Sequence, residues 1–385
     1  MRRWLFCLVI LFLPEFVRSS KISCRNQNGD RVDWFVINKL PDLNQHASKI
    51  VQEGMGFLYL DESVDRWRLS QDDLNSTHQA LAYTLQQVYD LKSRDNVYHM
   101  MYNDKHPDGK SDSYRGHAKG VQLFDQSSGF WLIHSVPQFP PVNAYSYPKS
   151  GTTFGQSFLC VSFDTKQSLS EIAEQLFLAM PSIYSSSVPA RLAQLYPRIG
   201  DIVGKKSLRK PPYSRKAQLN SKGWKSFTSF SKHKKWDKDL YADFVSPSLK
   251  NTFYVETWLN GPDDLPSICN STFKTYNLRK VRPTAIEFDS SKDHSKWAVS
   301  KDGHDPWVCI GDINRQQSQF RRAGGTLCIG DQAVWSNFRR AAVEAEGCKT
   351  FPVPVPAPVA GSPESGVVLW TVLPFIVGYQ LCFYI

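Results

Sequence analysis

The stretch RGHAKG, residues 115–120, places His117 and Lys119 two positions apart, and DHSKWAVS repeats this spacing with His294 and Lys296. Residues two apart in a β-strand point to the same face of the sheet. We therefore expect the first pair to project together from one strand and the second pair from another. The fold then has to bring two segments, one from each half of the chain, to a common place.

Paired imidazole and ammonium groups suit the cleavage of a phosphodiester. A lysine neutralises the non-bridging oxygens, one histidine attacks phosphorus, and a second histidine protonates the leaving oxygen. The motif alone is weak evidence, because about half a copy is expected by chance in a chain of this composition. A third copy, His233 and Lys235 in SKHKKW, lies in a basic run, and we interpret it as a solvated charge cluster.

The surroundings of the first two pairs strengthen the hypothesis. Gly116 and Gly120 flank the first histidine and lysine, and glycine permits a close approach of the backbone to a ligand. Candidate supporting residues follow the pairs in GFWLIHS and CIGDINR; they are His134, Ser135, Asp312, Asn314 and Arg315. Other roles remain open, namely a hydrogen bond in the core for His134 and ion pairs for Asp312 and Arg315.

Helices and strands are expected to mix in both halves of the chain, so the fold class is α/β or α+β. The expected strands are residues 32–40, 56–63, 96–104, 120–125, 129–140, 252–258, 284–291, 296–300 and 307–314. The expected helices are residues 74–93, 168–180, 240–252 and 333–346. Ser168 or Ser170 is the expected cap of the second helix. The turn-rich DQSSG predicts a hairpin between two of the strands.

Positive charge is concentrated in residues 203–238, which contain twelve Lys and Arg residues. Trp224, Phe227, Phe230 and Trp236 are interleaved with these cations. The whole chain has a formal charge of +10, which fits a polyanionic partner such as nucleic acid or an acidic membrane surface. Two interpretations of the segment stay open: a surface that contacts a polyanion, and a solvated surface insert.

The two ends of the chain predict passage through the secretory pathway. Residues 1–20 have paired arginines, an apolar run and small residues, as in a secretory signal peptide. Their apolar run is short for a membrane anchor. Residues 351–365 form a Pro-rich stalk, and residues 366–385 are apolar and uncharged. This tail is interpreted either as a glycolipid-anchor signal or as a transmembrane helix.

The cysteines also predict secretion. Six of the eight lie between the two apolar ends, and an even set in an exported chain indicates three disulfides with 15 possible pairings. None lies in a CxxC pair, so we expect no zinc site. The sequons at Asn75 and Asn270 predict glycosylated surface loops.

Several of these stretches together resemble the deoxyribonuclease II family of lysosomal acid endonucleases. The stretches that carry the resemblance are VDWFVINKLP, YLDES, RGHAKGV, GFWLIHSVPQFPP, FGQSFLCVSF, DHSKW, WVCIGDINR and GGTLC. The resemblance implies a catalytic domain over residues 21–350 with a phospholipase D-like fold. Two pseudo-symmetric lobes, about 24–200 and 201–348, would each contribute one His-x-Lys pair to a shared site.

The resemblance further implies hydrolysis of DNA to 3′-phosphate and 5′-hydroxyl ends through a phosphohistidine intermediate, with no metal or other cofactor. The catalytic residues that it implies are His117, Lys119, His294, Lys296 and Asn314. The disulfides that it implies are Cys24–Cys160, Cys269–Cys348 and Cys309–Cys328. Ala298 stands where relatives have a cysteine outside these pairs. Asp125 is one position later than the wider superfamily pattern requires, so it receives no role.

Three functions from different classes follow from these observations. The first is an acid endonuclease that acts on DNA without sequence specificity, in the lysosome, or alternatively secreted or held at the cell surface by a glycolipid anchor. The second is a catalytically silent, polyanion-binding or toxin-like glycoprotein on the same fold. The third is a phospholipase acting on lipid head groups. Intact His-x-Lys pairs favour an enzyme, and the basic composition favours a nucleic acid as its substrate.

Overall fold

The computed structural model describes residues 22–348. The predicted signal peptide, the Pro-rich stalk and the apolar tail lie outside the described residues. Within the part that is described, no helix has both the length and the apolar character needed to cross a bilayer.

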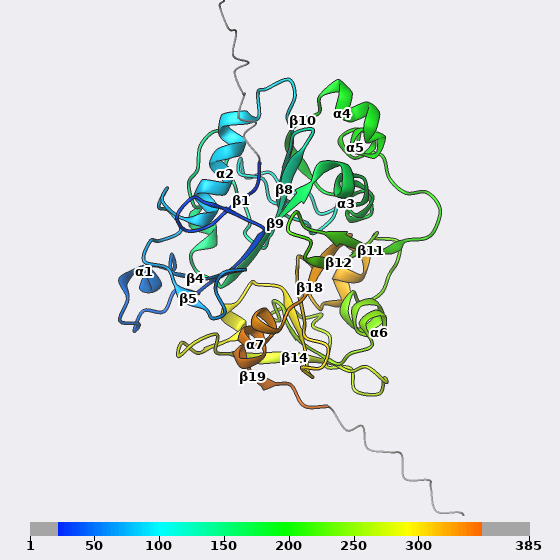
Figure 1. The fold of residues 1–385 in the computed structure, drawn as a ribbon. Coiled ribbons are helices and arrows are strands. Elements are labelled where there is room, and N and C mark those ends of the chain that lie inside the picture. The colour runs from blue at the N-terminus through cyan, green and yellow to red at the C-terminus, as the bar shows by residue number, and fades with distance from the viewer. Residues whose placement is uncertain (1–21, 349–385) are drawn as a thin grey trace, which may run out of the picture. The chain divides into compact units, whose positions relative to one another are not determined.

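The first half of the chain forms an eight-stranded antiparallel sheet (Figure 1). Its strands, in spatial order, are β10 (Ile183–Ser187), β6 (Tyr98–Tyr102), β7 (Gly120–Phe124), β8 (Ser128–His134), β9 (Gln156–Asp164), β3 (Trp34–Lys39), β4 (Phe57–Asp61) and β5 (Arg68–Leu69). The predicted hairpin is confirmed as β7–β8. A two-stranded ribbon of β1 (Cys24–Arg25) and β2 (Arg31–Val32) precedes the sheet.

The second half forms a nine-stranded mixed sheet. Its strands are β11 (Ser214–Asn220), β12 (Ser226–Lys232), β18 (Gly324–Gly330), β17 (Trp307–Gly311), β16 (Trp297–Ser300), β13 (Phe253–Glu256), β14 (Thr275–Val281) and β15 (Phe288–Asp289), with β19 (Ala342–Ala345) paired to β14. Strands β13 and β14 run parallel, and the other pairs run antiparallel. The fold class is therefore mixed α and β, as predicted.

Seven α-helices accompany the sheets within the described residues. They are α1 (Lys49–Gln52), α2 (Ala80–Leu91), α3 (Thr165–Ala179), α4 (Ala190–Leu195), α5 (Pro197–Val203), α6 (Ser246–Leu249) and α7 (Gln332–Ala341). A π-helical turn at Tyr241–Val245 runs directly into α6. Helix α3 packs on strands of both sheets, β9 on one and β11, β12 and β18 on the other (Figure 1).

The two sheets share one hydrophobic core. Alternation along the strands sends Val36 and Leu159 of the first sheet and Val299 and Ile310 of the second into this common core. The intervening residues of the first sheet pack against α2, and those of the second sheet pack around the π-helical turn. Strand β17 contacts β8 and β9, so the sheets meet where these central strands end. The described residues all belong to one compact unit, and its division into lobes at about residue 200 stays a prediction.

Several element predictions were wrong in detail. Helix α3 begins before Ser168 and is capped by Asp164, whose side chain accepts hydrogen bonds from two backbone amides at 3.0 and 3.3 Å. Residues 284–291 contain only the short β15, because a 3-10 turn begins at Ser290. The last predicted helix ends at Ala341, and the chain continues as strand β19, which pairs with β14.

The structure contains the three disulfides that the resemblance implies, Cys24–Cys160, Cys269–Cys348 and Cys309–Cys328. The last of these joins residues directly opposite each other on β17 and β18. Both sequon asparagines, Asn75 and Asn270, are exposed. Their glycosylation stays a prediction.

Candidate active site

The first His-x-Lys pair lies in a segment that leads into β7, not within a strand as expected. The backbone amide of Gly116 donates to Met180 at 2.9 Å, and that of His117 donates to Ala323 at 2.8 Å. A Cβ at position 116 would lie 1.9 Å from the carbonyl oxygen of Ala179, which only glycine avoids. Gly116 therefore allows a close approach between two segments of the backbone, and not the approach to a ligand that we expected.

The second pair also lies in a segment that precedes a strand, in this case β16. This segment docks on the first sheet: the amide of His294 donates to the Gly155 oxygen at 2.9 Å, and that of Lys296 donates to Ser157 Oγ at 3.2 Å. Asp293 and Gly155 form an isolated parallel bridge. The second sheet thus delivers its histidine and lysine to the end of β9 in the first sheet.

Both pairs line one cavity of about 130 Å³. Its lining residues are Asp104, Lys105, His117, Lys119, Ser135, Pro137, Trp258, His294, Lys296 and Asn314. The five residues with implied catalytic roles are therefore together at one place. Larger hollows exist, but one of about 600 Å³ beside Trp224 is lined by several carboxylates, which repel a polyanion.

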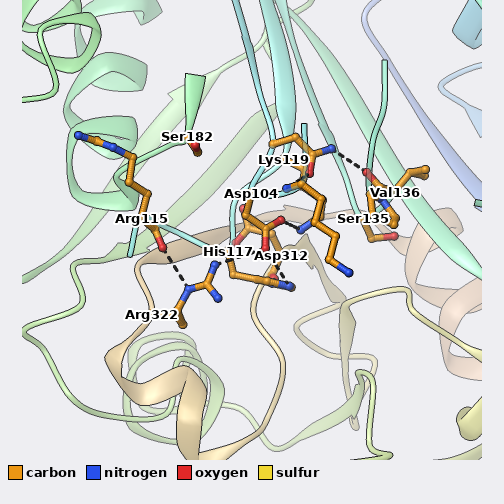
Figure 2. Close-up of polar contacts among 12 residues, drawn as sticks. Asp104, Arg115, His117, Lys119, Ser135, Val136, Ser182, Asp312 and Arg322 are labelled. Atoms are coloured by element: carbon orange, nitrogen blue, oxygen red, sulfur yellow. Dashed lines mark hydrogen bonds and ion pairs between the residues drawn. The ribbon is translucent and has the colours of Figure 1, made fainter. Parts of the chain in front are cut away.

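Asp104 connects the cations around the first pair (Figure 2). Lys119 Nζ donates to Asp104 Oδ1, Arg322 Nη2 lies 3.3 Å from Oδ2, and His117 Nε2 lies 3.8 Å from Oδ2. Burial opposes ionisation of Asp104, but the charges of these neighbours outweigh it and lower the pKa of the carboxyl group. Asp104 therefore remains ionised in acid.

Sequence reasoning missed Asp104 and Arg322. The only available signal for Asp104 was its position at the polar end of the expected strand 96–104, and Arg322 had none. Arg322 comes from the turn before β18, and its Nε donates to the Arg115 carbonyl oxygen at 3.1 Å. Both residues join the first pair through tertiary contacts.

The ring of His117 is held in one orientation by the second half of the chain. Its Nδ1 donates a hydrogen bond to the main-chain oxygen of Asp312 (Figure 2). A carbonyl oxygen can only accept, so Nδ1 carries the proton and the lone pair of the neutral ring lies on Nε2. Burial and the nearby Lys119 lower the pKa of His117 to about 3, which favours this neutral form.

Two aromatic rings enclose His294. Phe154 stacks on the imidazole with ring centroids 4.2 Å apart, and Trp258 meets it edge-on at 3.9 Å. Burial, Lys296 and Lys119 lower the pKa of His294 to about 2. Its Nε2 is buried and has no hydrogen-bond partner among the described residues.

Lys296 is close to the second imidazole but is anchored on its backbone. Its Nζ donates to the main-chain oxygen of His294. Burial, together with the charge of Lys119, lowers the pKa of Lys296 to about 7. Two ammonium groups therefore share one small buried site, a costly arrangement that an anionic ligand relieves.

Two of the candidate supporting residues lie at the cavity. Ser135 accepts from the Ser157 amide at 2.9 Å and donates to Gln156 Oε1 at 2.5 Å. Asn314 is buried, and its Oδ1 has no hydrogen-bond partner in the described part of the chain. Such an amide is available to a ligand that carries a hydrogen-bond donor or to a histidine.

The other three supporting candidates have positions of a different kind. His134 is fully buried between Phe139 and Phe158, with ring centroids 5.4 and 5.9 Å away. Arg315 is fully buried and its Nε lies 2.9 Å from Asp239 Oδ2, in the second half's core. Asp312 contacts the site through its main-chain oxygen, while its side chain accepts from the Gly325 amide at 2.9 Å.

Comparison with known proteins gives consistent matches along the chain. The family model described as Deoxyribonuclease II matches residues 23–348. Cell-death-related nuclease 7 of Caenorhabditis elegans is 40% identical over 349 residues, which cover 89% of this chain and 92% of that protein. Plancitoxin-1 of Acanthaster planci is 38% identical, with 89% and 96% covered. Deoxyribonuclease-2-beta of Mus musculus is 35% identical, with 90% and 98% covered. The chain therefore belongs to the deoxyribonuclease II family.

Proposed function

We propose that the protein is an acid endodeoxyribonuclease that cleaves DNA phosphodiesters to 3′-phosphate and 5′-hydroxyl ends without a metal, through a phosphohistidine. The observation that carries this proposal is the single cavity lined by both His-x-Lys pairs and Asn314. Two ammonium groups there provide the positive charge that a phosphodiester anion needs. Family membership supports DNA as the substrate.

His117 is the nucleophile in this proposal, because its protonated Nδ1 leaves the Nε2 lone pair free. Nε2 forms a bond to phosphorus, the bond from phosphorus to the 5′-oxygen breaks, and protonated His294 gives its proton to that oxygen. Neutral His294 then takes a proton from water, which attacks phosphorus and breaks the phosphorus–nitrogen bond. The products are a 3′-phosphate and a 5′-hydroxyl, and both rings return to their starting states.

Lys119, Lys296 and Asn314 have electrostatic roles. The two lysines offset charge on the non-bridging oxygens, and Asp104 holds Lys119 in position. Asn314 lines the cavity, and in this proposal its side-chain Nδ2 donates to the phosphate. None of these steps requires a divalent cation.

Acid activity follows from the proton that His294 must carry. In the empty site burial, together with the charges of both lysines, lowers the pKa of His294 to about 2. A bound phosphodiester offsets these positive charges and raises the pKa of His294, so substrate and proton bind together. The rate then falls as rising pH removes the proton. In the free enzyme burial and Lys119 lower the pKa of His117 to about 3, so this ring is neutral when the substrate binds.

The arrangement of the two pairs supports a phospholipase D-like fold with two lobes. Each pair precedes the first strand of an antiparallel pair, β7–β8 in the first sheet and β16–β17 in the second. Polar cavity residues follow the second strand in each case, Ser135 after β8 and Asn314 after β17. The lobes share a hydrophobic core, so the proposed symmetry is one of local arrangement around the site.

We place the protein in the secretory pathway, with the lysosome as the destination that best suits acid chemistry. Three disulfides are typical of an oxidising compartment. A cell-surface form held by the C-terminal tail is the alternative. Treatment of expressing cells with a glycolipid-specific phospholipase distinguishes the two, because only an anchored form is released.

Plasmid nicking at pH 5 in EDTA tests the proposed activity. We expect wild-type protein and His304→Ala, which changes an exposed histidine, to nick equally. His117→Ala and His294→Ala are each expected to lose about 10²–10⁴-fold in rate. End labelling should give 3′-phosphates, and rapid quenching at alkaline pH should trap a phosphoprotein that His117→Ala lacks. If the wild-type protein binds DNA but does not nick the plasmid, the result would favour a catalytically silent, toxin-like glycoprotein instead.

A further inference from the structure

An exposed tyrosine lies on the loop that leads to His117 of the cavity. Tyr114 lies three positions before His117 and has 66% of its surface accessible. Lys234, which follows β12 in the second half, places its Nζ 3.0 Å from the centroid of the Tyr114 ring. The cation covers one face of the ring and leaves most of the side chain open to solvent.

The loop that carries this tyrosine is firmly held. Asp112 Oδ1 accepts from the amides of Tyr114 and Arg115, both at 3.1 Å, and the Asp112 amide donates to the Asp104 oxygen at 2.8 Å. Arg115 Nη2 reaches the Lys205 oxygen at 3.3 Å, and its carbonyl oxygen accepts from Arg322 (Figure 2). The tyrosine therefore has a defined position relative to Asp104 and His117.

The cation on the Tyr114 ring belongs to a group of lysines that lack an acidic partner. Lys205, Lys234 and Lys235 form no ion pair with any residue of the described part. Lys235 also lies 5.7 Å above the ring of Tyr213, against which His233 stacks at 5.6 Å. In the third His-x-Lys copy only Lys235 is exposed, while His233 is fully buried, so the interpretation as a solvated cluster is wrong for the histidine. Neither residue lines the cavity.

The rest of the basic segment is engaged elsewhere. Phe227 and Phe230 are fully buried, so they cannot present rings to a ligand. Lys232 is buried and donates to three main-chain oxygens. Trp224 is 70% exposed, but its hollow is lined by carboxylates, including Asp33 and Asp331. Tyr114, which lies outside this segment, combines an exposed ring, a lysine that forms no ion pair with the described residues, and a position three residues before a cavity residue.

We propose that Tyr114 and Lys234 form a substrate subsite, in which the tyrosine ring stacks on a base of DNA and the lysine contacts an adjacent phosphate. This inference rests on the proposed function and identifies how the strand is held beside the scissile bond. Stacking on aromatic rings is independent of base identity, and lysine–phosphate contacts are too, so the subsite gives no sequence preference. A base within a duplex is already stacked, so single-stranded or frayed DNA gains most.

The test compares Tyr114→Ala with Tyr114→Phe and with the control Trp224→Ala, an exposed aromatic outside the subsite. On single-stranded DNA, we expect Tyr114→Ala to lose about 10-fold in kcat/KM through KM, while Tyr114→Phe and the control keep wild-type values. On duplex DNA the loss should be smaller. On bis(4-nitrophenyl) phosphate, which has no base, all variants should match wild type.

Charge is tested separately with Lys234→Gln. We expect the slope of log KM against log salt on single-stranded DNA to fall by about 0.7. Lys49→Gln removes an exposed lysine of the first half and should leave the slope unchanged. Wild-type salt dependence in Lys234→Gln would overturn the lysine's part of the subsite.

Outcomes separate this inference from the proposed function. Equal kcat/KM for Tyr114→Ala and wild type on single-stranded DNA would overturn the subsite, as would equal losses on both substrates, which indicate a displaced His117 loop. Fluorescence anisotropy with a single-stranded oligonucleotide measures the subsite without turnover. If the wild type cleaves no DNA but its oligonucleotide binding depends on Tyr114, the proposed activity fails and the subsite stands.

Discussion

The main-chain oxygen of Asp312 accepts a hydrogen bond from Nδ1 of His117, although 195 positions separate the two residues in the chain. A residue of the second sheet thus sets the tautomer of a histidine delivered by the first. The converse also holds, because the amides of His294 and Lys296 bind Gly155 and Ser157 of the first sheet. Each half orients the reactive groups of the other.

Asp104→Asn tests whether this carboxylate positions the first pair. We expect kcat to fall about 10-fold or more, because Lys119 and Arg322 lose their shared partner. The Asp104 carboxylate raises the pKa of His117, so its loss lowers that pKa and shifts the acid limb of the pH–rate profile downward.

The stability of Asp104→Asn against unfolding is a second test of this role. Asp104 has a lowered pKa in the folded state, so it contributes stability above the ordinary carboxyl pKa that is lost as pH falls through the folded value. Asp104→Asn should therefore be destabilised by about 3 kcal/mol at pH 5 to 7 in urea unfolding. Asp108→Asn, at an exposed carboxylate, is the control. Unchanged stability together with an unmoved acid limb would exclude a positioning role.

An anion in the cavity should raise the pKa of His294. Burial, Lys296 and Lys119 hold this pKa low in the empty site, and a bound phosphate anion offsets part of the lysine charge. NMR titration of the ring resonances with and without inorganic phosphate measures the shift, which we expect to be about two units or more. The ring resonances of His304, which is exposed and outside the cavity, are the control and should not respond to phosphate. If the pKa of His294 is the same with and without phosphate, the binding of substrate is not coupled to protonation of His294.

Trp258→Ala should loosen the ring of His294. Trp258 meets the imidazole edge-on, and its removal leaves only Phe154 of the two enclosing rings. We expect kcat to fall about 10-fold with a smaller change in KM, because the proton donor is no longer held in line with the leaving oxygen. Trp258→Phe should retain most activity. If Trp258→Ala changes KM alone, the ring binds substrate instead of positioning the histidine.

Glu256→Gln should make the stability of the folded protein fall less as the pH rises to neutrality. Glu256 is fully buried behind the second pair, its Oε2 accepts from Ser290 at 2.6 Å, and burial and then Asp293 raise its pKa. A raised folded pKa means that the folded state binds more protons, so stability falls as pH rises above the ordinary carboxyl range.

Thermal unfolding between pH 4 and 8 measures this effect. Wild-type Tm should decline across the interval, and Glu256→Gln should decline less. Glu344→Gln, which removes an exposed carboxylate, should follow wild type. A Glu256→Gln curve parallel to wild type would show that this buried acid does not tie the fold to acidic pH.

Local sequence patterns predicted much of the scaffold. Alternating or continuous apolar runs bounded by turn residues located β3, β4 and β6, the β7–β8 hairpin, and β16 and β17. Predictions failed where a tertiary contact competed with local preference. Helical periodicity continues past Ala341, but pairing with β14 takes residues 342–345 into a strand. Asp164 caps α3 in place of the nearby serines because β9 ends there.

The amino-acid sequence by itself determined which groups carry the chemistry: two His-x-Lys pairs, Asn314, and cysteines whose pairing followed from the family resemblance. Only the tertiary structure decided what surrounds them. No local pattern relates Asp104, Arg322, Phe154 or Trp258 to the histidines, because these residues meet them only in space. The physical reason is that charge interaction, desolvation and ring contact act between neighbours in the fold, wherever those neighbours lie in the chain.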